Sequence, residues 1–350
     1  MRSPRSSLAA ALLLLTALGC STSAQARDSF RVCWSNYAGW LPWGYAAQQR
    51  IVDKWAKKYG ISIDVVRVDD TLDAVKQYTA GQFDGCTMNN LDALAHPAAA
   101  GIDTTALILG DFSAGNDGIL LRGKNVRVQD LKGQDVQLVK NSAAHYLLVR
   151  GLESVQLSEE DVTVVPVAAA DLAASTSAAV AAWNPTLSQL QAKGDSTQVF
   201  SSHRIPGEII HMFAVNTDTL RENPALGRAL TGAWFDIMKR MNATDDKGAA
   251  TLAAIAKSAG IELQDYQDQL GKARSFYSAR GAVAFAENPA SPAAMERVAA
   301  FAFNHGMLGK ATSAQSIGIS FANGVVVGSP ANIKLRFDPA FMRVAADGKL

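Results

Sequence analysis

The first half of the chain alternates short apolar, β-branched runs with longer runs that have helical periodicity. Four runs have the pattern of buried strands: residues 30–34, 61–68, 83–88 and 104–109. Three runs have apolar residues on one helical face: 44–59, 71–78 and 90–97. Gly60 ends the first helix, Asp70 or Thr71 can cap the second, and Asn90 can cap the third. This order predicts an α/β fold with a largely parallel sheet and helices on both faces.

A second cycle follows along the chain. Strands are predicted at 119–121, 136–139, 162–167 and 178–183, with a helix capped by Ser142. Residues 209–215 predict a returning strand, and helices are predicted at 223–241, 251–259 and 291–303. Asn323 and Gly324 predict a hairpin turn. We expect two lobes, with the chain crossing twice between them. One lobe is made of 27–117 and 212–350, with a helical C-terminal segment, and the other is made of 118–211.

The N-terminal segment has the layout of an export signal. Arg2 and Arg5 precede an apolar run at 8–18, and Ala24-Gln25-Ala26 supplies a small-x-small cleavage site. The apolar run is too short for a stable membrane anchor. We therefore expect residues 1–26 to be a signal peptide and the mature protein to reach the periplasm. Cys20, which follows Ala17-Leu18-Gly19, leaves a lipid anchor open as an alternative.

Charge and motif content exclude several classes. The chain has 33 Lys and Arg against 32 Asp and Glu and no basic block, which disfavours nucleic acid as a partner. It has no nucleophile elbow, phosphate loop, dinucleotide fingerprint or zinc spacing. We therefore expect a binding protein, not an enzyme, with no cofactor and no metal. Cys33 and Cys86 lie in apolar runs, and both a disulfide and two buried thiols are compatible with the sequence.

An aromatic loop directly follows the first predicted strand. It contains Trp34, Tyr37, Trp40, Trp43 and Tyr45, interrupted by Gly39, Pro42 and Gly44. Loops lie at the surface, and rings at the C-terminal end of a strand commonly hold a small ligand. We interpret Trp34, Tyr37 and Trp40 as ligand contacts, whereas Trp43 and Tyr45 can equally pack under the following helix.

Polar residues at the ends of the other strands complete the candidate site. They are Asn89, Asn90, Asp92, Asp111, Asn116 and Asp117, then Asn141, Ser142, His145, Trp183 and Asn184 in the second lobe, and Glu208 before the return crossing. Acids and rings without Lys or Arg favour a cation or a donor-rich neutral ligand over an anion. The aspartates and Asn90 can instead be caps or turn residues. His145 is interpreted as a capping or surface residue, and His203 and His211 are given no role.

Three motifs occur in a characteristic order. They are Tyr-Thr-Ala-Gly-Gln-Phe-Asp at 78–84, Val-Gln-Asp-Leu-Lys-Gly at 128–133 and Ala-Trp-Asn-Pro at 182–185. In this order they resemble the substrate-binding component of ABC importers of the nitrate, taurine and sulfonate type. Residues 32–35, 39–45, 83–88 and 205–210 resemble, more narrowly, binding proteins of urea transporters associated with urea- or guanidine-carboxylase pathways. The segment 176–180 departs from the wider pattern, because it lacks the acid of a Gly-x-Val-Asp-Ala strand.

The resemblance implies a class II periplasmic-binding-protein fold of two lobes that close on a ligand. It implies a small nitrogen-rich ligand of guanidinium or urea type, and an ABC permease with its ATPase as partners. The alternatives are a receptor for an anion such as taurine, sulfonate or nitrate, and a ligand-loaded sensor that docks on a membrane receptor. A related fold occurs in enzymes of thiamine-precursor synthesis, but their Cys-rich motif is absent here.

Overall fold

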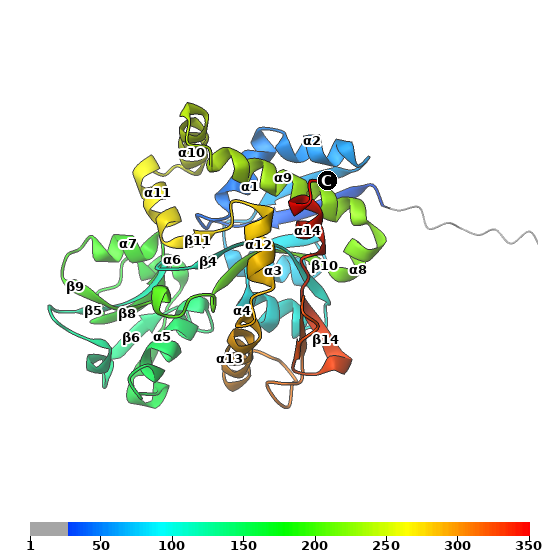
Figure 1. Cartoon of the computed structure of the whole chain (residues 1–350). Helices are drawn as coiled ribbons and strands as arrows, with labels where there is room; N and C mark the ends of the chain where they lie inside the picture. The colour runs from blue at the N-terminus through cyan, green and yellow to red at the C-terminus, as the bar shows by residue number, and fades with distance from the viewer. Residues whose placement is uncertain (1–26) are drawn as a thin grey trace, which may run out of the picture.

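The computed structural model describes residues 27–350 of the chain. The expected signal peptide, with Cys20 and its alternative lipid anchor, lies outside the described residues. Within 27–350, no helix combines the length and the apolar character needed to cross a bilayer. The molecule consists of two α/β halves, each built around its own sheet, with the smaller half drawn in green at the left of Figure 1.

The larger half contains a nine-stranded sheet. Its strands are β1 (Ser29–Trp34), β2 (Ser62–Arg67), β3 (Gly85–Asn89), β4 (Thr104–Ser113), β10 (Ile210–Asn216), β11 (Ala273–Ser275), β12 (Gly318–Phe321), β13 (Val326–Val327) and β14 (Ile333–Phe337). The order is β13-β12-β14-β4-β10-β3-β1-β2, and β11 also pairs with β4. The predicted parallel pairing holds for β1, β2 and β3. The returning β10, however, inserts between β3 and β4 in the antiparallel direction.

The smaller half contains a five-stranded sheet. Its strands are β5 (Asp117–Arg122), β6 (Asp135–Leu138), β7 (Thr163–Pro166), β8 (Ala179–Trp183) and β9 (Ser196–Ser201), in the order β7-β6-β8-β5-β9. The chain enters this half through residues 114–116 and returns through 202–209. Both connections lie beside each other at the junction of the two sheets. The lobe boundaries at 117/118 and 211/212 stay a prediction.

Helices cover the faces of both sheets (Figure 1). They are α1 (Leu41–Gln48), α2 (Ile51–Lys58), α3 (Thr71–Thr79), α4 (Asn90–Ala93), α5 (Ala143–Glu153), α6 (Ala169–Leu172), α7 (Thr186–Gln191), α8 (Thr217–Glu222), α9 (Pro224–Met241), α10 (Asp246–Ala259), α11 (Leu263–Gly271), α12 (Ala279–Ala286), α13 (Ser291–Asn304) and α14 (Ala340–Ala346). A π-helical segment, η1 (Leu94–Ala98), follows α4, and short 3-10 turns are η2 (Val128–Leu131), η3 (Glu159–Asp161), η4 (Ser202–Arg204) and η5 (Pro330–Asn332).

Two helix predictions need correction. The helix expected over 44–59 is divided into α1 and α2, because Arg50 adopts a left-handed backbone with φ of 56° and ends the regular hydrogen bonding. The cap of α4 is Asn89 instead of Asn90. The Asn89 side chain accepts a hydrogen bond from the backbone N–H of Asp92. Asn90, as the first helical residue, is left free to bond elsewhere.

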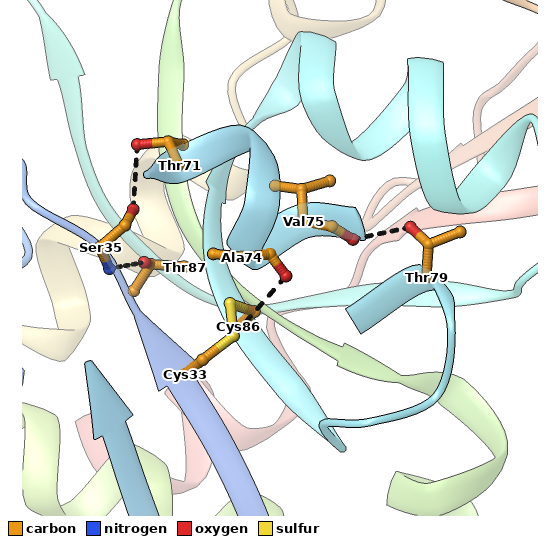
Figure 2. Close-up of a disulfide and its surroundings, with 8 residues drawn as sticks. All are labelled: Cys33, Ser35, Thr71, Ala74, Val75, Thr79, Cys86 and Thr87. Carbon is orange, nitrogen blue, oxygen red and sulfur yellow. Dashed lines mark hydrogen bonds between the residues drawn. A yellow bond between two sulfur atoms is a disulfide. The ribbon is translucent and has the colours of Figure 1, made fainter. Parts of the chain in front are cut away.

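Cys33 and Cys86 form a disulfide (Figure 2). They are register partners on the parallel strands β1 and β3, with Cα atoms 4.5 Å apart. Both side chains are fully buried, and Ala74 of α3 lies beside the bond (Figure 2). Of the two alternatives that the sequence left open, the structure therefore has the covalent link.

Candidate functional site

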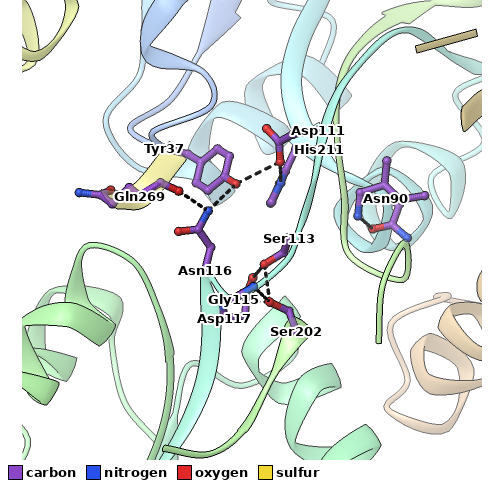
Figure 3. Close-up of polar contacts among 11 residues, drawn as sticks. Tyr37, Asn90, Asp111, Ser113, Gly115, Asn116, Asp117, Ser202, His211 and Gln269 are labelled. Atoms are coloured by element: carbon purple, nitrogen blue, oxygen red, sulfur yellow. Dashed lines mark hydrogen bonds and ion pairs between the residues drawn. The ribbon is translucent and has the colours of Figure 1, made fainter. Parts of the chain in front are cut away.

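The strands β4 and β10 bring an acid and a histidine together at the junction of the two sheets. Asp111 and His211 are register partners, and Nδ1 of His211 lies 2.7 Å from Oδ1 of Asp111. Both side chains are buried. Figure 3 shows this pair directly beside the segment in which the chain passes from β4 into β5. The pair therefore belongs to the larger sheet and lies next to the crossing into the smaller half.

Tyr37 and Trp40 cover this pair from the loop between β1 and α1, whereas Trp34 lies in β1, and Trp43 and Tyr45 lie in α1. The hydroxyl of Tyr37 donates to Oδ1 of Asp111 at 3.1 Å, and the Tyr37 ring lies 4.1 Å from the His211 ring between centroids. The Trp40 ring stands edge-on to both, at 5.0 Å from Tyr37 and 5.6 Å from His211. Trp40 is buried, and its Nε1 finds no hydrogen-bond partner among the described residues. The site thus contains a buried donor that is free to bind an acceptor.

Gly39 allows the loop to come this close. A Cβ atom at position 39 would lie 2.3 Å from Oδ2 of Asp111 and 2.7 Å from the Tyr37 ring. Both distances are far below van der Waals contact. Only glycine therefore lets the backbone between Tyr37 and Trp40 lie over the carboxylate.

A chain of side-chain amides continues the site into the smaller half. Asn116 donates to the Tyr37 hydroxyl at 3.3 Å and to the carbonyl of Gln269 at 3.1 Å. Its own carbonyl oxygen accepts from Asn184 at 2.9 Å. Asn184 in turn accepts from Ser188 of α7. These bonds join the aromatic loop, the first crossing, α11 and the end of β8.

A second polar group fixes the two crossings to each other. Ser113 donates to Asp117, and the Ser113 and Ser202 hydroxyls lie 2.7 Å apart. Ser202 also accepts from the backbone N–H of Gly115 at 2.8 Å. Figure 3 shows these residues around the start of β5. The outgoing and returning segments are therefore linked beside the Asp111–His211 pair.

Three carboxylates control the charge of His211. Burial is the largest influence on the pKa of His211 and lowers it, but Asp111, Asp117 and Asp92 outweigh burial and raise that pKa above its ordinary value. We therefore treat His211 as an imidazolium that compensates Asp111. It is a cation within a cluster that contains three acids.

Asp92 and Asp117 ionise less readily than ordinary aspartates. Burial raises the pKa of Asp92 to about 7, against the opposing effects of His211 and a hydrogen bond from Asn89. Burial also raises the pKa of Asp117, against the hydrogen bond from Ser113. An ionised carboxylate in a buried site needs a partner. A bound molecule with N–H donors would supply one.

Several of the predicted residues lie together in this cluster: Tyr37, Trp40, Asp92, Asp111 and Asp117. Asn89 adjoins it, because its amide donates to Oδ2 of Asp92 at 2.7 Å. Asn89 is the register partner of His211 on β3, so Asp92, which is bonded to Asn89, lies on the same side of the site.

Asn90 and Glu208 are already satisfied by protein partners. The Asn90 amide donates to the Glu208 backbone carbonyl at 2.9 Å and accepts from the backbone N–H of Ile210 at 3.0 Å. The Glu208 carboxylate is bound by Tyr146, by Arg150 at 2.8 Å and by Arg297 at 3.0 Å. These residues position the return crossing.

The remaining predicted residues have structural contacts. Ser142 caps α5 by accepting the backbone N–H of His145. Trp183 is the register partner of Asp117 at the end of β8. Trp34 packs so closely on α1 that a Cβ at Gly44 would lie 2.4 Å from its ring. A role for these three in binding stays a prediction.

His211 was assigned no role from the sequence, although the structure places it at the centre of the site. Only the register between β4 and β10 puts it opposite Asp111, and no local pattern reports which strand becomes a neighbour. Gln269 was missed for the same reason, since α11 approaches from a distant part of the chain. The side chain of Lys272 adjoins this network by donating to Ser188 at 3.3 Å.

Solved structures share the overall fold. The alkanesulfonate-binding protein SsuA from Xanthomonas axonopodis pv. citri, bound to MOPS, has a TM-score of 0.61 at 19% identity, covering 82% of this chain and 96% of that one. A sulfonate-binding SsuA from Methylobacillus flagellatus KT has a TM-score of 0.67 at 14% identity, covering 92% and 95%. The desulfurization enzyme DszB has a TM-score of 0.51 at 18% identity, covering 80% and 93%.

These identities establish the fold alone, which is the predicted two-lobed periplasmic-binding-protein architecture. A comparison with curated protein sequences finds no match. A family model described as NMT1/THI5 like matches residues 45–236, more than half of the chain. This span includes β2 to β10 and most of the polar cluster. The chain therefore belongs to the NMT1/THI5-like family.

Proposed function

We propose that the protein is an exported solute receptor of an ABC importer, and that its ligand is a small nitrogen-rich compound of urea or guanidinium type. The family and the shared fold of periplasmic sulfonate-binding proteins support the receptor role. Its partners would be a permease and an ATPase, and it would act in the periplasm, free or lipid-anchored. The observation that supports the ligand is the buried cluster of Asp92, Asp111 and Asp117 around a single histidine.

The charges of the cluster support a ligand that donates hydrogen bonds. His211 compensates Asp111, but no arginine or lysine hydrogen-bonds to Asp92 or Asp117 within the described residues. A planar compound with several N–H groups could donate to both carboxylates. The faces of Tyr37 and Trp40 would add ring contacts to a flat cation or amide.

The indole of Trp40 distinguishes the two ligand types. Its N–H is a buried donor without a partner in the described part of the chain. Urea carries a carbonyl oxygen that can accept this bond, whereas guanidinium carries only donors. Guanidinium would instead gain more from the carboxylates. The site therefore supports both ligands. Urea binding should depend more on Trp40, and guanidinium binding should depend more on Asp111.

An anion such as taurine, a sulfonate or nitrate is the alternative ligand. The SsuA relatives bind sulfonates by their descriptions, and His211 and Trp40 could both donate to an anion. Three neighbouring carboxylates would oppose it, and Lys272 is separated from Asn184 by Ser188. A sensor that presents its ligand to a membrane receptor would use the same site.

Binding without chemical change is the proposed mechanism. A ligand that contacts both halves favours the arrangement in which they lie together. The shared fold with DszB makes catalysis a necessary control. Each ligand that binds should be recovered unchanged, by mass spectrometry, after prolonged incubation with the protein. Conversion of the ligand would contradict the receptor role.

A thermal-shift panel tests the proposal directly. Purified mature protein is heated with urea, guanidinium, taurine, an alkanesulfonate or nitrate, each at matched ionic strength. A ligand at 100 times its dissociation constant should add about 2.7 kcal/mol to the free energy of unfolding. Stabilisation by urea or guanidinium supports the proposal. Stabilisation by taurine, the sulfonate or nitrate alone would assign the site to anions.

A further inference from the structure

A glutamate lies between two histidines away from the candidate site. Nε2 of His145, in α5, lies 2.7 Å from Oε1 of Glu159, and Nε2 of His305 lies 2.7 Å from Oε2 of the same carboxylate. His145 is buried, while His305 and Glu159 keep 13% and 31% of their side-chain surface exposed. The two imidazole rings meet edge-to-face with centroids 4.6 Å apart.

The hydrogen bonds determine where the protons lie. Nδ1 of His305 lies 2.8 Å from the backbone carbonyl of Phe301, which can only accept, so Nδ1 carries a hydrogen. Nε2 of His305 faces a second acceptor, the Glu159 carboxylate, and must also carry a hydrogen. His305 is therefore an imidazolium in this arrangement. Without that proton, two lone pairs would face each other at 2.7 Å.

His145 has the complementary assignment. Its Nδ1 accepts from the backbone N–H of Asn141 at 3.1 Å, so its Nε2 carries the hydrogen that is donated to Glu159. Two imidazoles and a carboxylate are also a common zinc-binding combination. A zinc ion would need the Nε2 lone pair of His145, and hence the loss of the Asn141 bond. The contacts favour a proton over a metal ion.

The cluster connects the two halves of the molecule. His145 and Glu159 belong to the smaller half, on α5 and η3. His305 directly follows α13, which packs on α4 and η1 of the larger half. The rings of Tyr146 and Phe301 lie 5.4 Å apart between centroids where α5 meets α13, at the bottom of Figure 1. Arg297 of α13 makes a second ionic contact across this interface, to Glu208.

We propose that His305, Glu159 and His145 form a proton-dependent clasp, in which the proton on His305 holds α13 of the larger half against α5 and η3 of the smaller half. The Nε2 hydrogen of His305 makes the bond to Glu159, so the clasp loosens as rising pH removes that hydrogen. The Glu208–Arg297 contact, which uses a guanidinium, keeps its charge over the same range. The interface therefore has one permanent ionic contact and one that depends on pH.

Further charged groups are carried by the elements that pack together at the clasp. From η3 they are Glu160 and Asp161, and Asp161 is bound by Lys132 at 3.0 Å. From α5 the group is Arg150, which is bound to Glu208 and Glu153. From α4 and η1 behind α13 they are Asp92 and His96, and burial lowers the pKa of His96. Hydrogen bonding from His145 lowers the pKa of Glu159, so this carboxylate stays ionised at neutral pH.

Nuclear magnetic resonance of the imidazole nitrogens tests the proton assignment on the wild-type protein. His305 should show protons on both nitrogens at pH 6 and on Nδ1 alone at high pH, whereas neutral His145 should carry its proton on Nε2. His305→Gln and His145→Gln assign the signals. A neutral His305 at pH 6, or a His145 protonated on Nδ1, would overturn the proposal.

Melting temperatures between pH 5.5 and 8 test the consequence. Wild-type protein should lose about 2–4 °C more than His305→Gln over this range, because glutamine cannot titrate. His203→Gln, which removes an exposed histidine, should behave like the wild type. If the melting temperatures of wild type and His305→Gln change identically with pH, the proposed clasp is contradicted. A rise in melting temperature with micromolar Zn²⁺ that disappears in His145→Gln would assign the cluster to a metal instead.

Discussion

Asp111 of β4 and His211 of β10 face each other across an antiparallel pair, with Oδ1 and Nδ1 2.7 Å apart. Neighbouring carboxylates keep the imidazole protonated, and the imidazole compensates the charge of the acid. The site therefore has a lower net negative charge than its three aspartates suggest. A ligand therefore meets the Asp111–His211 ion pair and the two further acids, Asp92 and Asp117.

Asp111→Asn should separate the two ligand classes. The change removes the charge and keeps the shape, so guanidinium affinity should fall at least about tenfold, as expected for one charge-assisted hydrogen bond. Urea should lose less, because it is neutral. Calorimetry on wild type and variant measures both. Asp265→Asn, an exposed site on α11, is the matched control. An unchanged affinity for the best ligand would exclude Asp111 and leave Asp92 and Asp117 to be tested.

Asp92 should make stability depend on pH. Its folded pKa of about 7 lies above the unfolded value of 3.8, so its stabilising contribution is complete below about pH 4 and is lost as the pH rises through 7. Asp92→Asn stays neutral and should exceed the wild type at pH 8 by on the order of 2 kcal/mol, with the difference vanishing at pH 4. Thermal unfolding is the suitable measurement, because urea and guanidinium are the proposed ligands. A variant less stable than wild type at pH 8 would contradict the prediction.

Trp40→Phe should report on the unpaired indole N–H. A ligand with a carbonyl oxygen should bind roughly tenfold more weakly, since one hydrogen bond is lost while the ring face remains. Guanidinium affinity should change little. Trp234→Phe is the matched control, because Trp234 is equally buried and its Nε1 also lacks a partner among the described residues. Its ring stacks on Trp43, whereas the Trp40 ring contacts Tyr37 and His211. Equal losses in both variants would point to general packing.

Glu208→Gln should destabilise the protein more than it weakens binding. Burial is the largest influence on the pKa of Glu208 and raises it, but the hydrogen bonds from Arg150 and Tyr146 outweigh burial and lower that pKa, so the contribution of Glu208 is present at neutral pH and lost in acid. Leaving Arg150 and Arg297 without this partner should cost about 3 kcal/mol at pH 7. The loss should shrink below pH 4. A large loss of ligand affinity with an unchanged melting temperature would instead indicate that Glu208 contacts the ligand.

Removal of the disulfide should lower the stability of the protein. Cys33 and Cys86 are separated by 53 positions, and closing a loop of this length contributes about 4 kcal/mol in the chain-entropy description. The Cys33→Ala/Cys86→Ala protein should therefore melt several degrees lower. A strong reductant should lower the melting temperature of the wild type but not of the double variant. Equal melting temperatures for the wild type and the double variant would mean that the disulfide does not stabilise the protein.

Local patterns were sufficient for most of the framework. The apolar run at 104–109 lies within β4, the β-branched run at 61–68 contains β2, and Pro224 starts α9 as predicted. The hairpin at Asn323 and Gly324 is also present, with Gly324 at a φ of 81° between β12 and β13. Such features depend on near neighbours in the sequence. They are therefore visible without knowledge of the fold.

The site was predictable only in part, because its centre depends on distant pairings. Asp111 was identified from its place after an apolar strand, yet its partner His211 lies 100 positions away. Glu208 was expected to be available as an acid, and no local signal indicated that Arg150 and Arg297 would bind it. The break at Arg50 was missed because the apolar stripe continues across it. Strand order and side-chain pairing are properties of the whole fold.

The link between β1 and β3 also bears on how the protein should be produced. One strand leads into the loop of Tyr37 and Trp40, and the other leads into Asn89 and Asp92. In protein made in a reducing cytosol, the backbone hydrogen bonds between β1 and β3 would hold these strands together without the disulfide. Affinities measured on such material would describe a site whose two walls are no longer tied together. Secretion, or refolding under oxidising conditions, is therefore part of any valid ligand screen.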